Sequence, residues 1–219
     1  MFEKYRKEII ILGIVIIVPI IFIGLYYIFR SPVETKGEKN GSKLPYINIS
    51  GKDTDAINEY LETLYKQYSS DKKSKLTYKT EKYKNIISLL VSIDEYNNET
   101  NETIKKYLAF NVKQDGTFVD KEEMAELFGY SLEEIVDKVD KKLNEYYQDE
   151  AIEGYIDSNE CSYNCYLSYA RGINNILNEI SLVIENGKLT VYINLSKDDI
   201  NGDKEYFEKI ENPDKIILE

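Results

Sequence analysis

The chain has 219 residues, enough for one folded domain with a sizeable core, and it carries a net charge of −11 with no His and no Trp. This acidic balance argues against nucleic acid and anionic lipid surfaces as partners. Without His there is no Ser-His-Asp triad or Cys-His pair, and no Gly-rich phosphate loop is present, so we expect no enzyme, no cofactor and no metal site.

Residues 9–29 form the longest apolar stretch of the chain and contain no charged residue. As a helix rising about 1.5 Å per residue, this segment would span about 31 Å, close to the thickness of the hydrocarbon layer of a bilayer. The stretch is longer than the apolar region of a usual signal peptide, and no small-residue cleavage site follows it. We therefore predict one transmembrane helix that acts as an uncleaved signal anchor in the lipid bilayer.

The charges around this segment set the predicted topology. Lys4, Arg6 and Lys7 cluster before the span, whereas the basic residues after it are dispersed, which favours an N-terminus inside the cell. The first thirty residues carry +2, so the remainder carries −13. The predicted organisation is a cytoplasmic tail (1–8), a transmembrane helix (9–29), a polar flexible stalk (30–43) and an extracytoplasmic domain (44–219).

The first half of the predicted domain begins with an alternating strand at 44–49. Residues 54–70 show helical periodicity, with Asp53 or Thr54 as the expected cap. The buried face of this helix is predicted to contain Ile57, Leu61, Leu64 and Tyr68. Three strand-like runs follow at 76–82, 85–96 and 104–112, and Asp115-Gly116 has the composition of a turn.

The second half is predicted to contain a short helix at 121–128, ended by Gly129. Ser131 and Glu134 form a capping box that begins a helix at 132–148. Residues 166–177 could be strand or helix, and Asn186-Gly187 indicates a hairpin between strands at 180–184 and 189–195. Strands and helices are segregated, which indicates an α+β class with a mostly antiparallel sheet packed by two main helices.

Two short segments could carry a cross-link or an ion. Cys161 and Cys165 are the only cysteines, and an even pair in an extracytoplasmic compartment predicts a disulfide, with free thiols or a metal as the alternatives. Residues 199–203 have the first Asp and Asn spacings of a calcium-binding EF-hand loop. However, Lys204 and Ile210 occupy the positions that need Gly and Glu, so we predict no calcium site.

The order of these elements resembles the extracytoplasmic domain of RsiV-type anti-sigma factors, which is shared with the N-terminal module of PdaC-type peptidoglycan deacetylases. The resemblance covers about residues 44–195, and its best pieces are 86–89 and 115–128. The His-containing stretch of those domains is replaced by residues 97–103, and residues 1–8 are too short to hold a sigma factor. The resemblance therefore implies the fold and a sensing or binding role, with lysozyme as the family's known partner.

These observations predict a membrane-anchored extracytoplasmic binding or sensing protein of the cell envelope. Its candidate ligands are a basic, lysozyme-like protein, which the acidic charge would suit, or a cell-wall component. The alternatives are a cell-wall enzyme that works through carboxylates and a structural envelope protein that self-associates. The abundance of Ile, Lys, Asn, Glu and Tyr is typical of a low-GC, Gram-positive bacterium.

Overall fold

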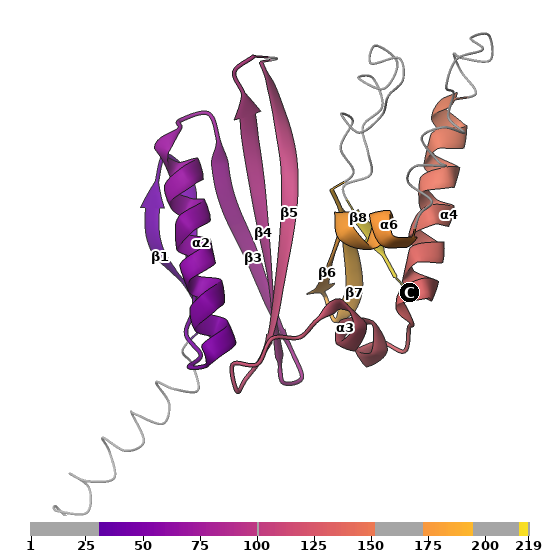
Figure 1. Cartoon of the computed structure of the whole chain (residues 1–219), viewed down its shortest axis with the longest axis horizontal. Coiled ribbons are helices and arrows are strands. Elements are labelled where there is room, and N and C mark those ends of the chain that lie inside the picture. Colours follow the sequence, from indigo (N-terminus) through magenta and orange to yellow (C-terminus); the bar gives the residue numbers. More distant parts are fainter. Residues whose placement is uncertain (1–30, 100, 152–172, 195–214, 219) are drawn as a thin grey trace, which may run out of the picture.

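The computed structural model describes residues 31–99, 101–151, 173–194 and 215–218. These residues form three antiparallel sheets, with strand orders β1-β2, β3-β4-β5 and β6-β7-β8, together with four helices (Figure 1). The α+β class and the antiparallel pairing are therefore confirmed. The strands are β1 (Val33–Lys39), β2 (Ser42–Ile47), β3 (Lys75–Tyr83), β4 (Ile86–Asn97), β5 (Glu102–Lys113), β6 (Ile180–Glu185), β7 (Lys188–Ile193) and β8 (Lys215–Ile217). The helices are α2 (Lys52–Ser70), α3 (Lys121–Leu127), α4 (Leu132–Ala151) and α6 (Ile173–Glu179).

The predicted transmembrane segment (9–29) and the cytoplasmic tail (1–8) lie outside the described residues. Within the described ranges, no helix combines the length and the apolarity that a membrane crossing requires.

The predicted flexible stalk was wrong for most of its length, because residues 33–39 form β1 and pair with β2. Asn40 and Gly41 make the turn between the two strands, with φ angles of 53° and 79°. This left-handed pair suits a tight hairpin. Only Val33 of β1 is buried, so the strand lacks the alternation of apolar residues that would have identified it.

Helix α2 covers one face of the central sheet together with β1 and β2 (Figure 1). Its predicted apolar face is confirmed, since Ile57, Leu61, Leu64 and Tyr68 are all buried. They pack against the odd-numbered residues of β4, which are Ile87, Leu89, Val91 and Ile93. Each fully buried side chain of this size contributes about 1.5–3 kcal/mol, so this apolar contact is the main stabilising interaction on that face.

The start of α2 differs from the prediction, because Gly51 is the N-cap and no side chain caps it. Instead, Thr54 Oγ1 lies 2.8 Å from the carbonyl oxygens of both Ile49 and Gly51, which share its single proton. Asp53 Oδ2 accepts a hydrogen bond from the amide of Phe118 at 3.0 Å. The first turn of α2 is thus fixed by the loop after β5 rather than by a local cap.

The segment between β5 and α4 follows the sequence prediction closely. Asp120 caps α3 by accepting from the amide of Glu123 at 2.8 Å. The capping box before α4 forms, since Ser131 N donates to Glu134 Oε2 at 2.7 Å and Glu134 N donates to Ser131 Oγ at 3.1 Å. Gly129 adopts a φ of 81° where α3 ends, as its position predicted.

The β6-β7 hairpin also forms as predicted, with Asn186 and Gly187 at φ angles of 53° and 73°. Sheet β6-β7-β8 packs with α3, α4 and α6 around a second apolar core. Residues of this core include Ile135, Ile176 and Val191, which are almost completely buried. The described residues therefore form two large apolar cores, one under α2 and one between the β6-β7-β8 sheet and its helices. A smaller cluster of Leu90, Tyr107, Val183 and Tyr192 lies between the two three-stranded sheets.

Candidate binding site between the two three-stranded sheets

Strand β6 lies at the edge of its own sheet, and its free backbone groups meet side chains from the central sheet. The amide of Ile184 donates to Ser88 Oγ at 3.0 Å, and Asn111 Nδ2 donates to the carbonyl of Leu182 at 2.8 Å. Ser88 Oγ in turn donates to Asn111 Oδ1 at 2.7 Å. These two buried side chains take the place of a neighbouring strand and satisfy an edge that would otherwise be exposed.

A similar contact fixes β5 to the end of β7. The side-chain amide of Asn194 binds both backbone groups of Tyr107, accepting from its N–H at 2.7 Å and donating to its carbonyl at 2.8 Å. Ser181 Oγ donates to the same carbonyl at 2.9 Å. The rings of Tyr107 and Tyr192 lie 4.6 Å apart, so an aromatic contact accompanies these hydrogen bonds.

The turn of the β6-β7 hairpin is held by Glu81 of β3. Its two carboxylate oxygens accept hydrogen bonds from the amides of Asn186 and Gly187, both at 2.7 Å. Two N–H groups of a turn with positive φ form a small anion-binding concavity, and here a carboxylate of the same chain occupies it.

Glu185 is the centre of a group of charged residues beside this turn. It accepts hydrogen bonds from Tyr192 Oη at 2.6 Å and from Lys215 Nζ at 2.8 Å, and Lys79 Nζ lies 3.8 Å away. Burial by itself would raise the pKa of Glu185. The hydrogen bonds from Lys215 and Tyr192 and the nearby lysine charges outweigh that effect, so its pKa is below the usual 4.5. Glu185 is therefore ionised at neutral pH.

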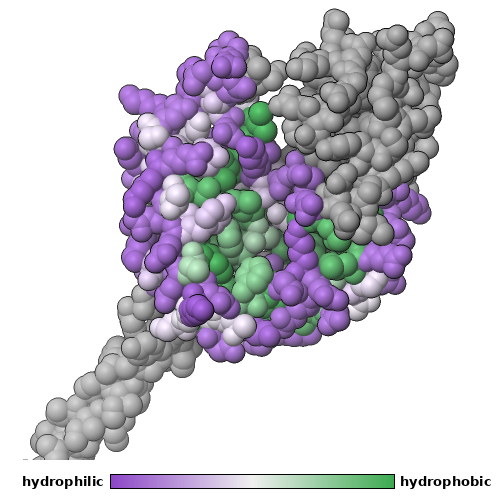
Figure 2. Space-filling view, in the orientation of Figure 1, coloured by the Kyte–Doolittle hydropathy of each residue, from purple (hydrophilic) through white to green (hydrophobic). Residues whose placement is uncertain are grey.

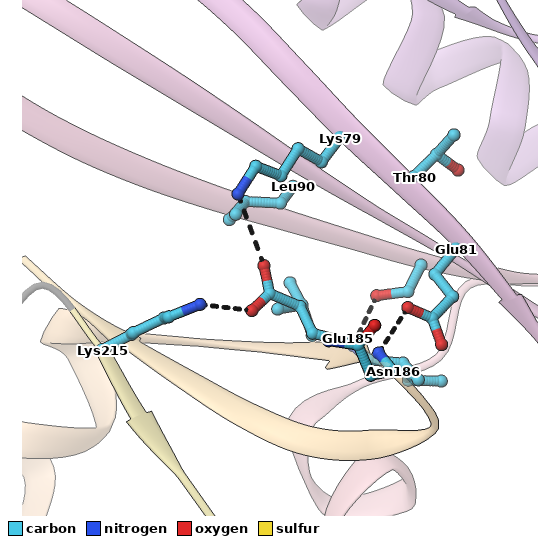
Figure 3. A pocket seen from close by; sticks show the side chains of 10 residues that line it. Lys79, Thr80, Glu81, Leu90, Glu185, Asn186 and Lys215 are labelled. Carbon is cyan, nitrogen blue, oxygen red and sulfur yellow. Dashed lines mark hydrogen bonds and ion pairs between the residues drawn. The ribbon is translucent and has the colours of Figure 1, made fainter.

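These residues surround a pocket of about 500 Å³ between the central sheet and the β6-β7 hairpin (Figure 3). Its lining residues are Lys79, Thr80, Glu81, Ser88, Leu90, Val183, Ile184, Glu185, Asn186 and Lys215. Leu90 and Val183 are almost completely buried, and the charged side chains of Lys79, Glu81, Glu185 and Lys215 lie around the pocket (Figure 3). Seven of the ten lining residues are polar or charged, so this pocket is more polar than the usual small-molecule site.

A second surface feature is an apolar area over β5, between the polar surfaces of α2 and of the second sheet (Figure 2). Phe118 and Tyr60 are large apolar side chains that remain 43% and 48% exposed. The ring of Tyr60 contacts that of half-buried Phe110 edge-on, with centroids 6.1 Å apart. Exposed aromatic residues of this kind are frequent where proteins bind other proteins.

The segment that carries Phe118 is rich in acidic residues. Residues 114–137 contain eight Asp or Glu and a single basic residue, Lys121. The ammonium group of Lys121 donates to the carbonyl of Leu177 near the end of α6, while Lys113 of β5 pairs with Glu123 at 2.7 Å. Burial lowers the pKa of Lys121 below its usual value, while the charge of Glu179 partly opposes that shift.

The site residues named from the sequence fall outside the structural description. Cys161, Cys165 and the calcium-like loop (199–203) all lie in segments that the structure does not describe, so the disulfide stays a prediction. Within the described ranges, no group of three or more His, Cys, Asp or Glu residues could hold a metal ion.

Sequence reasoning did not identify the charged residues of the pocket. The alternation of β3 places Lys79 and Glu81 on one face, and Glu185 directly precedes the hairpin turn, so weak local signals existed. Their partner Lys215 belongs to β8, a three-residue strand with no pattern of its own. Only the pairing of β8 with β7 brings this lysine to the pocket.

Comparison of the sequence with protein-family models gave no match, and comparisons with curated proteins and with solved structures gave none either.

Proposed function

We propose that this chain is a membrane-anchored extracytoplasmic binding or sensing protein of the bacterial cell envelope. In this proposal residues 9–29 lie in the lipid bilayer, residues 1–8 lie inside the cell, and the described α+β domain lies outside. The observation that supports a binding role most directly is the pocket between the two three-stranded sheets, whose volume of about 500 Å³ is within the range of small-molecule sites.

The way in which the chain enters the domain supports a short, stiff connection to the anchor. The amide of Asn48 donates to the carbonyl of Pro32 at 2.8 Å, and its side chain donates to the carbonyl of Ser31 at 3.4 Å. Only three residues separate the proposed span from Val33, a length of about 10 Å when extended. The domain would therefore stand close to the membrane surface, with little freedom to reorient.

A basic protein is a second candidate partner, and the surface around Phe118 favours it. There, exposed aromatic side chains adjoin a segment with eight acidic residues and one inward-turned lysine. Acidic surroundings accelerate association with a positively charged protein, and a half-exposed aromatic ring supplies contact area. A lysozyme-like protein has this chemistry.

The location is tested with the full-length chain carrying a tag after Glu219. We expect the chain to stay in membranes after a carbonate wash, and the tag to be removed by protease added to intact spheroplasts. Release by carbonate would reject the anchor, and a protected tag would reject the extracytoplasmic placement.

The binding role is tested with the full-length chain in lipid nanodiscs. We expect retention of the chain on insoluble peptidoglycan or on immobilised lysozyme, and loss of the lysozyme interaction as salt rises, since exposed charge pairs are screened. Turnover of muropeptides by the same preparation would instead favour a cell-wall enzyme. A concentration-dependent increase in mass by light scattering would favour a self-associating envelope protein.

A further inference from the structure

The pocket differs in charge from the rest of the molecule. The whole chain has a net charge of −11, yet two lysines and two glutamates line this pocket, so its walls are electrically neutral. The charges are also separated in space. Lys79 and Lys215 lie around Glu185, and Glu81 lies at the hairpin turn (Figure 3).

The positive end of the pocket keeps hydrogen-bonding capacity for a ligand. Lys215 is held at 2.8 Å from Glu185, and that carboxylate is fixed further by the hydroxyl of Tyr192. Lys79 lies 3.8 Å from the same carboxylate, which is too long for a hydrogen bond, and its side chain is 73% exposed. Two ammonium groups thus share one carboxylate, and the donors of Lys79 remain available.

The negative end is fixed in place by the backbone. Each oxygen of Glu81 accepts one hydrogen bond from the turn, at 2.7 Å, and a carboxylate oxygen has a second lone pair. A carboxylate held in this way does not need to reorganise to accept a further donor. The pocket therefore presents a preorganised acceptor at one end and an incompletely used ammonium at the other.

We propose that this pocket binds a small zwitterion, such as an amino acid or a short peptide with free termini. The carboxylate of the ligand pairs with Lys79 and Lys215, and its ammonium group pairs with Glu81. A purely anionic ligand would lie near two carboxylates and a purely cationic one near two ammonium groups, so a ligand with both charges is the best match. This assignment rests on the proposed binding function and names the class of its ligand.

The first test uses the full-length chain in nanodiscs and three probes that differ in which of their termini are charged. They are the dipeptide alanyl-alanine, its N-acetyl derivative and its C-terminal amide. We expect heat of binding in titration calorimetry with the free dipeptide, and an affinity lower by about tenfold or more for either capped form, since each loses one charge-assisted contact. Absence of binding by the free dipeptide at millimolar concentration, or equal binding of all three probes, would overturn the proposal.

A pair of variants locates the binding. Lys79→Gln is expected to weaken dipeptide binding by about tenfold, whereas Lys66→Gln leaves it unchanged. Lys66 is a matched control because it is 71% exposed and also pairs with a glutamate, Glu62, at 2.7 Å. Equal affinity of the Lys79→Gln variant and the unaltered chain would place binding elsewhere, provided that both have the same urea midpoint.

The outcome for the pocket is separable from the outcome for the proposed function. A chain that is retained by carbonate-washed membranes and binds peptidoglycan, but gives no heat with the dipeptide, would keep its envelope role and lose this ligand assignment. A chain that binds the dipeptide but leaves the membrane on washing would keep the pocket and lose the anchor.

Discussion

The two faces of β4 are covered in different ways. Its odd-numbered residues, among them Leu89 and Val91, pack into an apolar core under α2. On the other face, Ser88 of β4 and Asn111 of β5 form hydrogen bonds with the open edge of β6. One strand therefore supports an interface stabilised by buried apolar area and another that combines directed hydrogen bonds with a smaller apolar cluster of Leu90, Tyr107, Val183 and Tyr192.

The difference accounts for the pocket on the face that meets β6. Apolar side chains of α2 and β4 interdigitate, and close packing of that kind leaves little space. Where the edge of β6 meets the face of the central sheet, its backbone groups find hydrogen-bond partners only at particular side chains, such as Ser88 and Asn111. Between those points and the hairpin turn, the charged side chains of Lys79 and Glu185 surround an open volume instead.

The largest effect is expected on the apolar face. Leu89→Ala should reduce the free energy of unfolding by about 2–5 kcal/mol, because Leu89 is completely buried and its loss leaves a cavity. Urea unfolding followed by circular dichroism measures this change. Leu108→Ala is the control, since Leu108 is only partly buried against the same core. This change should reduce the free energy of unfolding clearly less than Leu89→Ala. Equal losses of unfolding free energy in the two variants would contradict the conclusion that Leu89 lies inside this core and Leu108 at its margin.

A smaller effect is expected on the polar face. Asn111→Ala should reduce the free energy of unfolding by about 1–3 kcal/mol, because the carbonyl of Leu182 and the hydroxyl of Ser88 lose their buried partners. The double variant with Ser88→Ala should cost less than the sum of the two single changes, since both act in one network. Strict additivity in a double-mutant cycle would show that the two side chains work independently.

The contact between the α2 start and the loop after β5 provides a third comparison. At Gly116, φ is +84°, and an added Cβ would lie 2.7 Å from the carbonyl oxygen of Ser50. Gly129 has a φ of +81° but no atom within 4 Å of such a Cβ. Gly116→Ala should therefore cost about 1–2 kcal/mol more than Gly129→Ala, which carries only the backbone strain. Similar urea midpoints for the two variants would show that the close approach of Gly116 to Ser50 does not restrict which residue fits at position 116.

The smallest effect on stability is expected from the ionisation of Glu185, which lines the pocket. The pKa of Glu185 is lowered in the folded chain, so its contribution to stability is present above the usual value of 4.5 and is lost as pH falls through the lower folded value. Glu185→Gln should therefore be less stable than the unaltered chain at pH 7, by less than about 1 kcal/mol, and this difference should shrink below pH 4. Urea midpoints measured across this range provide the test, and a constant difference would exclude ionisation of Glu185 as its cause.

The hairpins show how far local sequence signals reach. Asn186-Gly187 lies between two apolar strands and was predicted as a turn, and the structure confirms it. Asn40-Gly41 is the same dipeptide and makes the same kind of turn. However, its strand β1 is mostly polar, so the sequence predicts a flexible stalk there. An Asn-Gly signal therefore predicts a hairpin from sequence only where both flanking segments are apolar, as β6 and β7 are and β1 is not.

The sequence by itself determined the class of the described domain and most of its helices and strands, because apolar periodicity, the capping box at Ser131 and the turn residues act over a few neighbouring positions. Only the tertiary structure decided which strand edge meets which sheet face and where the pocket lies. Those features depend on contacts between distant residues, such as Asn111 and Leu182, which are 71 positions apart. No local pattern specifies such a pairing, since it follows from the way in which the edge of the β6-β7-β8 sheet meets the face of the central sheet.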